Sequence, residues 1–330
     1  MKKYKHIFVV YDRNVEGFAK RAAGQKWPML AITADEAHKT IDTVTEICRW
    51  LLEQGADRDA LVLAVGGGVT TDMAGFAASI YKRGVRYANV PTTLLSMVDA
   101  AIGGKTGVNL DGYKNLLGVI RQPEFTAIFP EALETLPERE MRSGVAEMLK
   151  TFIIKNQKGA YERAVDSFAS LGMTGASLGM TVKTELAELI QLAAGVKQEI
   201  VEKDEFESGL RRKLNLGHTF AHAIEWWQRD SFAGAGNDNS FTHGEAVAIG
   251  MVQAARISEK LGIAETGLAD RIAADLKACG LPTELPCPVE ELLPAILKDK
   301  KAEGGRINFV LPVKIGKVVV KKLQNLELLR

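Results

Sequence analysis

Three histidines, His218, His222 and His243, lie close together in the sequence. His218 and His222 are four residues apart in LNLGHTFAHAIE, so a helix would carry both on one face. His243 opens another segment of helical pattern, HGEAVAIGM. Two imidazoles and one carboxylate are a zinc-binding set that leaves a further position for substrate. The spacing favours His218 and His222 as the pair, but it does not decide which two of the three bind.

Glu147, in SGVAEMLKTF, is the strongest carboxylate for that set. It lies on the side of its expected helix that also carries Val145, Met148 and Leu149. A buried glutamate needs a partner, and a metal ion is one. The alternative is that the histidines cap and pack helices without a metal.

A second group of residues, basic except for one asparagine, stands in apolar or glycine-rich surroundings. Its members are Lys105, Lys114, Asn115, Lys150, Lys197 and Arg211. Lysine is rarely buried without a partner, so several such residues indicate an anionic small molecule bound between domains. Any one of them could instead be a solvated surface residue. Lys105 and Lys114, in what read as glycine-rich loops, fit that alternative least.

A glycine turn follows the apolar run LVLAV at 61–65. Gly66, Gly67 and Gly68 allow a tight turn into the next helix, whose free N–H groups can bind a phosphate. Thr92 and Thr93 follow the strand pattern RYANVP, at the same edge of a parallel sheet. The two turns together indicate a nucleotide site, and the alternative is a βα turn without a ligand.

The elements that must position these residues differ between the two parts of the chain. Up to residue 136, strand patterns at 6–12, 27–33, 61–65 and 86–91 alternate with helical ones, one starting near Thr40 or Asp42 and ending before Gly55. A further helix is expected to run on to Gly84. This alternation predicts an α/β domain at 1–136, with a parallel sheet covered on both faces.

From residue 137 onward, helical periods dominate. They cover 138–158, 181–203, 215–228, 243–261, 266–278 and 288–299, while only 307–313 and 317–323 look extended. These patterns predict a mostly α-helical domain at 137–330. The segments 170–180 and 229–241 read as loops.

Composition excludes several classes of protein. The 330 residues are 46% hydrophobic and 25% charged with a formal net charge of +1, which does not suggest nucleic acid or an anionic membrane as partner. No apolar run approaches the ~20 residues of a membrane helix, and IFVV near the N-terminus is too short for a signal peptide. Three cysteines without metal-type spacing fit reduced thiols in the cytoplasm.

The stretch 64–124, which contains AVGGGVTTDMAG and GGKTGVNLDGYKN, closely resembles the 3-dehydroquinate synthase family. The resemblance continues through LPEREMRSGVAEMLK, KQEIVEKDEFESGLRRKLNLGHTFAHAIE and HGEAVAIGM. It implies a Rossmann-like NAD-binding domain and an α-helical metal-binding domain, with catalysis in the cleft between them. It also implies a cytoplasmic homodimer that acts in the shikimate pathway of aromatic amino acid biosynthesis.

The family's motifs map onto particular residues. Metal, most simply Zn²⁺ with Co²⁺ as the alternative, would be bound by Glu147, His218 and His243, which leaves His222 for substrate and proton transfer. NAD would be contacted by Asp12, Asn14, Glu36, Lys39, Gly67, Gly68, Val69, Asp72, Thr92, Thr93 and Lys114. The sugar phosphate would meet Arg83, Asp99, Lys105 and Asn115, with Lys150, Lys197, Arg211, Asn215 and His222 at the catalytic centre. Either Lys300 or Lys301 would also reach its phosphate.

The reaction that the resemblance implies converts a 3-deoxy-heptulosonate phosphate to a carbocycle. Transient oxidation by NAD is followed by phosphate elimination, reduction and an intramolecular aldol closure. Related sugar-phosphate cyclases and metal-dependent polyol dehydrogenases on the same fold are the alternatives. The substrate-binding residues of the dehydroquinate synthase family are matched here by Lys197, Arg211, Asn215 and His222. This match favours the heptulosonate phosphate as substrate.

Three departures from the family pattern stand out. The first nucleotide-domain strand begins almost at the N-terminus, where the family has a hairpin, and the segment between YDRNV and ADEAHK is short. The gap between His218 and His243 is longer than usual, with 229–241 as the insertion.

Overall fold

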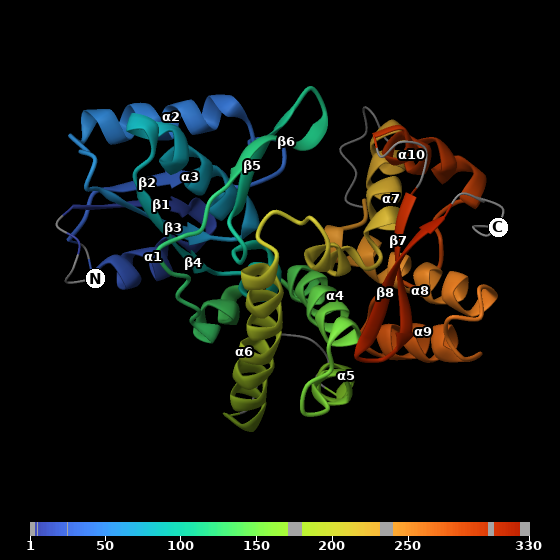
Figure 1. The fold of residues 1–330 in the computed structure, drawn as a ribbon. Helices are drawn as coiled ribbons and strands as arrows, with labels where there is room; N and C mark the ends of the chain where they lie inside the picture. The colour runs from blue at the N-terminus through green and yellow to red at the C-terminus, as the bar shows by residue number, and fades with distance from the viewer. Residues whose placement is uncertain are drawn as a thin grey trace. The chain divides into compact units, whose positions relative to one another are not determined.

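The chain folds as two compact units, Met1–Leu136 and Pro137–Arg330. A computed structural model describes Tyr4 and residues 6–24, 26–170, 180–231, 240–302 and 307–323, and its elements are shown in Figure 1. Within these ranges, no helix combines the length and the apolar character needed to cross a membrane.

The first unit is built on a parallel sheet of four strands. In the order β2-β1-β3-β4, the strands are β2(Met29–Ile32), β1(Ile7–Asp12), β3(Leu61–Gly66) and β4(Arg86–Pro91). Three helices connect them: α1(Glu16–Ala23), α2(Ile41–Glu53) and α3(Gly68–Ile80). The expected α/β architecture is confirmed. The strand order changes direction between β1 and β3, which is where open α/β sheets bind ligands.

Both faces of this sheet are covered by helices (Figure 1). Phe8 and Val10 of β1 belong to one buried cluster, which contains residues of α2 and α3. Val9 and Tyr11 belong to another cluster, which contains Ala19 of α1. Successive side chains of a strand point to opposite faces, so a strand covered on both sides is apolar throughout.

An antiparallel hairpin, β5(Lys105–Leu110) and β6(Tyr113–Ile120), corrects one expectation. Lys105 and Lys114 lie in these strands and not in glycine-rich loops. The strands are joined at Asp111 and Gly112, with φ angles of 49° and 78°. Asp-Gly with both φ angles positive is the chemistry of a tight two-residue hairpin turn.

The second unit is mostly helical, as expected. Its elements are α4(Glu138–Ile154), α5(Ala160–Ser170), α6(Met180–Lys203), α7(His218–Ser231), α8(His243–Lys260), α9(Leu268–Ala278), α10(Val289–Ala302) and the hairpin β7(Ile307–Lys314)–β8(Lys317–Leu323). Shorter helical segments across the chain are η1(Arg13–Val15), η2(Tyr81–Arg83), η3(Ser96–Ala100), η4(Pro130–Thr135) and η6(Leu210–Asn215).

Several expected boundaries in the second unit were wrong. The helical pattern at 138–158 breaks after Ile154, and α5 begins after Gly159, whose φ of 63° is left-handed. Helix α7 begins at His218, not at 215, and runs to Ser231, so the expected loop 229–241 begins inside it. Residues 232–239 of that loop, and 171–179 of the loop expected at 170–180, lie outside the described residues.

Candidate active site

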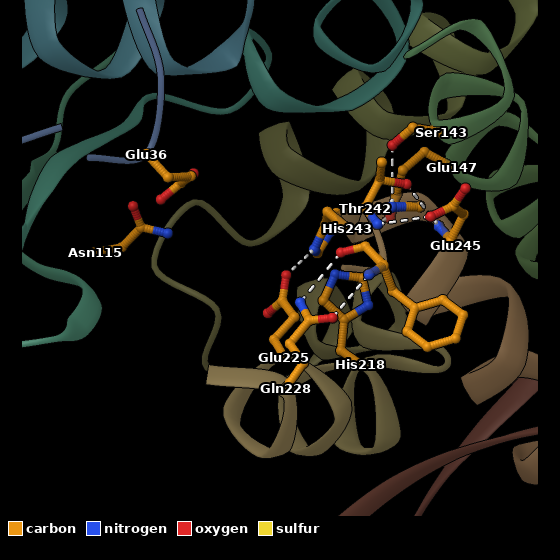
Figure 2. A network of polar contacts seen from close by, with 12 residues as sticks. Glu36, Asn115, Ser143, Glu147, His218, Glu225, Gln228, Thr242, His243 and Glu245 are labelled. Atoms are coloured by element: carbon orange, nitrogen blue, oxygen red, sulfur yellow. Dashed lines mark hydrogen bonds and ion pairs between the residues drawn. The ribbon is translucent and has the colours of Figure 1, made fainter. Parts of the chain in front are cut away.

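Glu147, His218 and His243 converge from three helices of the second unit (Figure 2). Glu147 lies in α4, His218 is the first residue of α7, and His243 is the first residue of α8. Their ligand atoms all lie within 4.8 Å of one another. A carboxylate and two imidazoles at this separation match the donor set of a catalytic zinc site.

Glycines beside the two histidines let the helices approach closely enough for this. A Cβ on Gly244, next to His243, would lie 2.1 Å from the carbonyl oxygen of Ser143 on α4. A Cβ on Gly250 of α8 would lie 2.0 Å from the carbonyl oxygen of Gly217, next to His218. The Ser143 hydroxyl also accepts a 3.0 Å hydrogen bond from the Gly244 N–H. Side chains at these positions would therefore force α4, α7 and α8 apart.

Glu147 is fully buried among charged partners. Its Oε2 forms an ion pair with the buried ammonium of Lys150, one turn later on α4. Its Oε1 lies 3.4 Å from Nε2 of His243. The expectation that a buried glutamate has charged partners is therefore confirmed, and its carboxylate faces the histidines.

Hydrogen bonds at Nδ1 fix the orientation of both imidazole rings. Nδ1 of His218 lies 3.2 Å from the carbonyl oxygen of Leu216. Nδ1 of His243 lies 3.1 Å from Oε1 of Glu225. A metal-binding histidine typically uses its second ring nitrogen in this way, which leaves Nε2 for the metal.

The surroundings of the two rings shift their pKa values in opposite directions. Burial lowers the pKa of His218 to about 3, and the nearby Lys150 charge acts in the same direction. Burial also opposes a charge on His243, but hydrogen bonds to Glu147 and Glu225 outweigh it and raise the pKa to about 10. The two carboxylates therefore favour the protonated form of His243.

His222 does not join the metal cluster. Among the described residues, the close group of ligand atoms consists of Glu147, His218 and His243. The His222 ring stands edge-on to His218 with centroids 5.5 Å apart, and the residue is exposed. The spacing favoured His218 and His222 as the pair, whereas the ligand atoms that lie together are those of Glu147, His218 and His243, from three different helices. Which residues bind a metal remains a prediction.

The other expected residues of the second unit are mostly buried cations. Lys150, Lys197 and Arg211 are all buried, from α4, α6 and η6. The Arg211 guanidinium donates to the carbonyl oxygen of Glu205. The Asn215 amide donates to the Glu207 carboxylate. Lys300 and Lys301 are in α10, but their side chains lie outside the described residues.

Sequence reasoning missed Glu225 and Glu207. Glu225 follows His218 by seven residues, two turns of α7, so helical spacing from the histidines could have found it. Glu207 has a φ of 59° and lies four residues before Arg211, outside regular helix. No simple periodicity indicates its contact with Asn215.

In the first unit, the glycine turn and the threonine turn meet at one edge of the sheet. The Thr92 N–H donates to the carbonyl oxygen of Gly66 over 2.9 Å. A Cβ on Gly67 would lie 3.0 Å from Cγ2 of Thr93, so the two turns are in contact. Gly67 is the N-cap of α3 and has no side chain to occupy the N–H groups of Gly68 and Val69.

Some of the other expected NAD residues of this unit are hydrogen-bonded in two separate groups. The buried Lys39 ammonium donates over 2.6 Å both to Asp72 and to the Asn115 side chain. Asn115 was expected to bind substrate, and here its side chain accepts a hydrogen bond from Lys39. Asp12, at the end of β1, accepts the N–H of Asn14 over 3.0 Å.

Four further residues of the first unit lie on separate elements. Arg83 ends η2, Asp99 lies in η3, Lys105 begins β5 and Lys114 lies in β6. Arg83 has a φ of 67° and is exposed. They remain predictions as substrate and NAD ligands.

Comparison with known sequences shows the family of the chain. Two family profiles, described as 3-dehydroquinate synthase N-terminal and 3-dehydroquinate synthase C-terminal, match residues 29–143 and 144–302. The chain belongs to the 3-dehydroquinate synthase family. It is 42% identical to the 3-dehydroquinate synthase of Acidithiobacillus ferrooxidans, over 95% of this chain and 84% of that one. It is also 42% identical to the enzyme of Dictyoglomus thermophilum, over 91% of this chain and 79% of that one.

Solved structures share the fold. A 2-epi-5-epi-valiolone synthase from Streptomyces hygroscopicus, with NAD⁺ and Zn²⁺ bound, has a TM-score of 0.87 and 29% identity, covering 99% of this chain and 90% of that one. A 2-deoxy-scyllo-inosose synthase has a TM-score of 0.84 over 99% of this chain and 89% of that one. Its identity is 24%, so it supports the fold alone. The expected architecture of a Rossmann-like domain and a helical domain is confirmed.

Proposed function

We propose that this chain converts 3-deoxy-arabino-heptulosonate 7-phosphate to 3-dehydroquinate and phosphate, as a carbon–oxygen lyase that depends on NAD and a divalent metal. The observation that carries the proposal is the convergence of Glu147, His218 and His243 in a chain of this family. The identity of 42% to curated 3-dehydroquinate synthases, against 29% to the valiolone synthase, favours this substrate over those of related cyclases.

The metal centre proposed for Glu147, His218 and His243 fits Zn²⁺, with Co²⁺ as the alternative. Supporting this choice are the buried carboxylate, the two Nε2 atoms left available, and the Zn²⁺ bound by the valiolone synthase. A bound divalent metal lowers the pKa of a coordinated hydroxyl and polarises the ketone formed from it. Glu147 would supply the negative charge and the two rings the neutral donors.

The NAD site is proposed at the sheet edge where β1, β3 and β4 end. NAD supplies a reversible acceptor for one hydride. The N–H groups at the start of α3, beside Gly67 and Gly68, would bind its pyrophosphate. The rest of the dinucleotide would be contacted by Asp12, Asn14, Glu36, Lys39, Val69, Asp72, Thr92, Thr93 and Lys114. Glu36 follows β2 closely, where an acidic residue accepts the ribose hydroxyls in dinucleotide-binding folds.

The buried cations of the second unit would hold the anionic groups of the substrate. Lys150, Lys197 and Arg211 have little exposure to water, so their charges act in a medium of low polarity. Arg83, Asp99, Lys105 and Asn115 would complete the substrate contacts from the first unit. Fixing both ends of the substrate lowers the entropic part of the barrier to elimination and ring closure.

His222 would move protons, with Asn215 orienting the same substrate oxygens. The His222 ring is exposed and adjoins His218 without sharing its metal position. An imidazole can accept and return a proton as a general base and acid. A metal-dependent polyol dehydrogenase would have no use for cations that bind a substrate phosphate.

The proposal is tested with the purified protein. Phosphate release from 3-deoxy-arabino-heptulosonate 7-phosphate is measured with NAD⁺ and Zn²⁺, and with each omitted after chelation and desalting. Release only when both are present is expected. Glucose 6-phosphate and sedoheptulose 7-phosphate serve as competing substrates, and faster turnover of either would assign the chain to another cyclase.

We further propose that the protein is a cytoplasmic homodimer, an assembly carried over from the family resemblance. Support for a reducing compartment comes from Cys48, Cys279 and Cys287, which are all free thiols. Light scattering coupled to size exclusion measures the assembly, and a monomer at micromolar concentration would contradict it.

A further inference from the structure

Asn109 stands at an irregularity in the β5–β6 hairpin. The pairing register shifts between Val108 and Leu110, so Asn109 is the residue that breaks the ladder. A bulge turns a side chain away from the regular alternation of its strand, and bulges are frequent beside active sites. The Asn109 side chain is turned toward the segment that follows β2.

The side-chain amide and the backbone N–H of Asn109 are both hydrogen-bonded. Its Nδ2 donates to Oε2 of Glu36 over 2.9 Å and to the Glu36 carbonyl oxygen over 3.3 Å. Its Oδ1 accepts the N–H of Asn115 over 2.9 Å. Its own N–H donates to the carbonyl oxygen of Lys39 over 2.9 Å.

Asn109 therefore joins residues that are far apart in the sequence. Asn115, at the other end of this contact, has a φ of 52° and accepts from the Lys39 ammonium, which also binds Asp72. Glu36 and Asn115 stand close to each other in Figure 2, with Asn109 bonded to both. The four residues Glu36, Lys39, Asp72 and Asn115 form one connected set around this asparagine.

We propose that Asn109 is a positioning residue of the dinucleotide site, which holds the Glu36 carboxylate ready to accept the ribose hydroxyls of NAD. The inference rests on the proposed NAD-dependent function. Glu36 is exposed, and an exposed glutamate otherwise samples several rotamers that must be given up on binding. A carboxylate fixed in this place also disfavours a dinucleotide that carries a 2′-phosphate, because the two groups have the same charge.

The test is the dissociation constant of NAD⁺ for the metal-loaded full chain, measured by calorimetry. Asn109→Ala is expected to raise it about tenfold, the loss of one hydrogen bond to a charged group. The preference of the variant for NAD⁺ over NADP⁺ is expected to fall, which a merely structural role of Asn109 would not cause. Asn156→Ala is the matched control, because Asn156 likewise donates to a glutamate, Glu162, and accepts a backbone N–H. It should leave NAD⁺ binding unchanged.

A double-mutant cycle separates positioning from an independent contribution. If Asn109 acts through Glu36, adding Asn109→Ala to Glu36→Ala should weaken NAD⁺ binding no further. The inference would be overturned if the double variant lost the product of the two single losses in NAD⁺ affinity. It would also be overturned if the dissociation constant of Asn109→Ala lay within twofold of wild type. If Glu36→Ala itself binds NAD⁺ as tightly as wild type, Glu36 is not an NAD ligand. That result contradicts the proposed NAD site, and the inference about Asn109 falls with it. If Asn109→Ala does not fold, Asn109→Asp replaces it in the test because aspartate has the same size as asparagine. Its negative charge beside Glu36 should weaken NAD⁺ binding at least as much.

Discussion

Oε1 of Glu225 lies 3.1 Å from Nδ1 of His243, although the two residues come from different helices. Glu225 is buried and shares α7 with His218. Helix α7 thus carries one of the proposed metal ligands, His218, and orients another, His243, through a carboxylate. The contact orients the His243 ring so that Nε2 faces Glu147.

Glu225→Gln should weaken metal binding about 10–100-fold, because the neutral amide is a poorer partner for the imidazole N–H. The dissociation constant is measured by competition with a chromophoric zinc chelator, without substrate or NAD⁺. Glu291→Gln is the control, since the Glu291 carboxylate accepts from the Trp227 indole over 2.8 Å. Equal affinities in wild type and Glu225→Gln would show that Glu225 does not orient the ligand.

Metal content should separate His222 from the true ligands. Glu147→Gln and His243→Ala each remove one donor of the cluster and are expected to lose tight metal binding. His222→Ala is expected to keep the metal and to lose turnover. Elemental analysis of the dialysed proteins decides between these assignments, and a metal-free His222→Ala would return the histidine to the coordination shell.

Lys197→Ala and Arg211→Ala should lose activity far more than stability. Each leaves an anionic group of the substrate without its buried partner, at ~2–5 kcal/mol of transition-state binding. Steady-state kinetics and thermal unfolding of the same preparations give the two quantities. Unchanged kcat/KM in both variants would place the substrate anions elsewhere.

The carboxylate of Asp204 is expected to stabilise the segment that carries Arg211 in a pH-dependent way. It accepts N–H groups of Arg211, Gly209 and Ser208 over 2.8–2.9 Å. The N–H groups of Arg211 and Gly209 are the main causes that hold the pKa of Asp204 below its ordinary value of 3.8. A depressed folded-state pKa means that the stabilisation is complete above pH 3.8 and is lost as the pH falls below it.

Asp204→Asn should therefore unfold at a lower temperature than wild type at pH 7, and the difference should shrink below pH 3.8. Asp166→Asn, at an exposed carboxyl on α5, is the control. Thermal unfolding followed by circular dichroism across this range is the measurement. A difference that does not change with pH would mean that the charge of Asp204 has no part in the effect.

The regular elements of the first unit were predictable because the apolar pattern of each sequence matches the burial of that element. β1 and β3 are apolar throughout since both faces of their sheet are covered, and Gly66 to Gly68 mark where the chain turns into α3. The hairpin β5–β6 was missed because its glycines suggested a loop. The Asp111-Gly112 pair was the signal that could have identified it.

The candidate site was only partly predictable. Glu147 follows from one helix, since a glutamate among apolar neighbours is buried and must be paired. The choice between His222 and His243 does not follow from one helix, because it depends on how α8 packs on α4 through Gly244. The family resemblance assigned His243, whose ligand atom lies with those of Glu147 and His218, whereas spacing within α7 suggested His222. Contacts such as those of Asn109 depend on a shift in strand register and have no periodic signal.

The central claim is that NAD⁺ is reduced and reoxidised within one turnover while phosphate leaves the substrate. NADH absorbance and phosphate are followed together on one sample, with substrate in large excess over NAD⁺ and with Zn²⁺ present. We expect many equivalents of phosphate for each NAD⁺ supplied and no steady growth of NADH. Stoichiometric NADH without phosphate would contradict it and would identify a dehydrogenase instead.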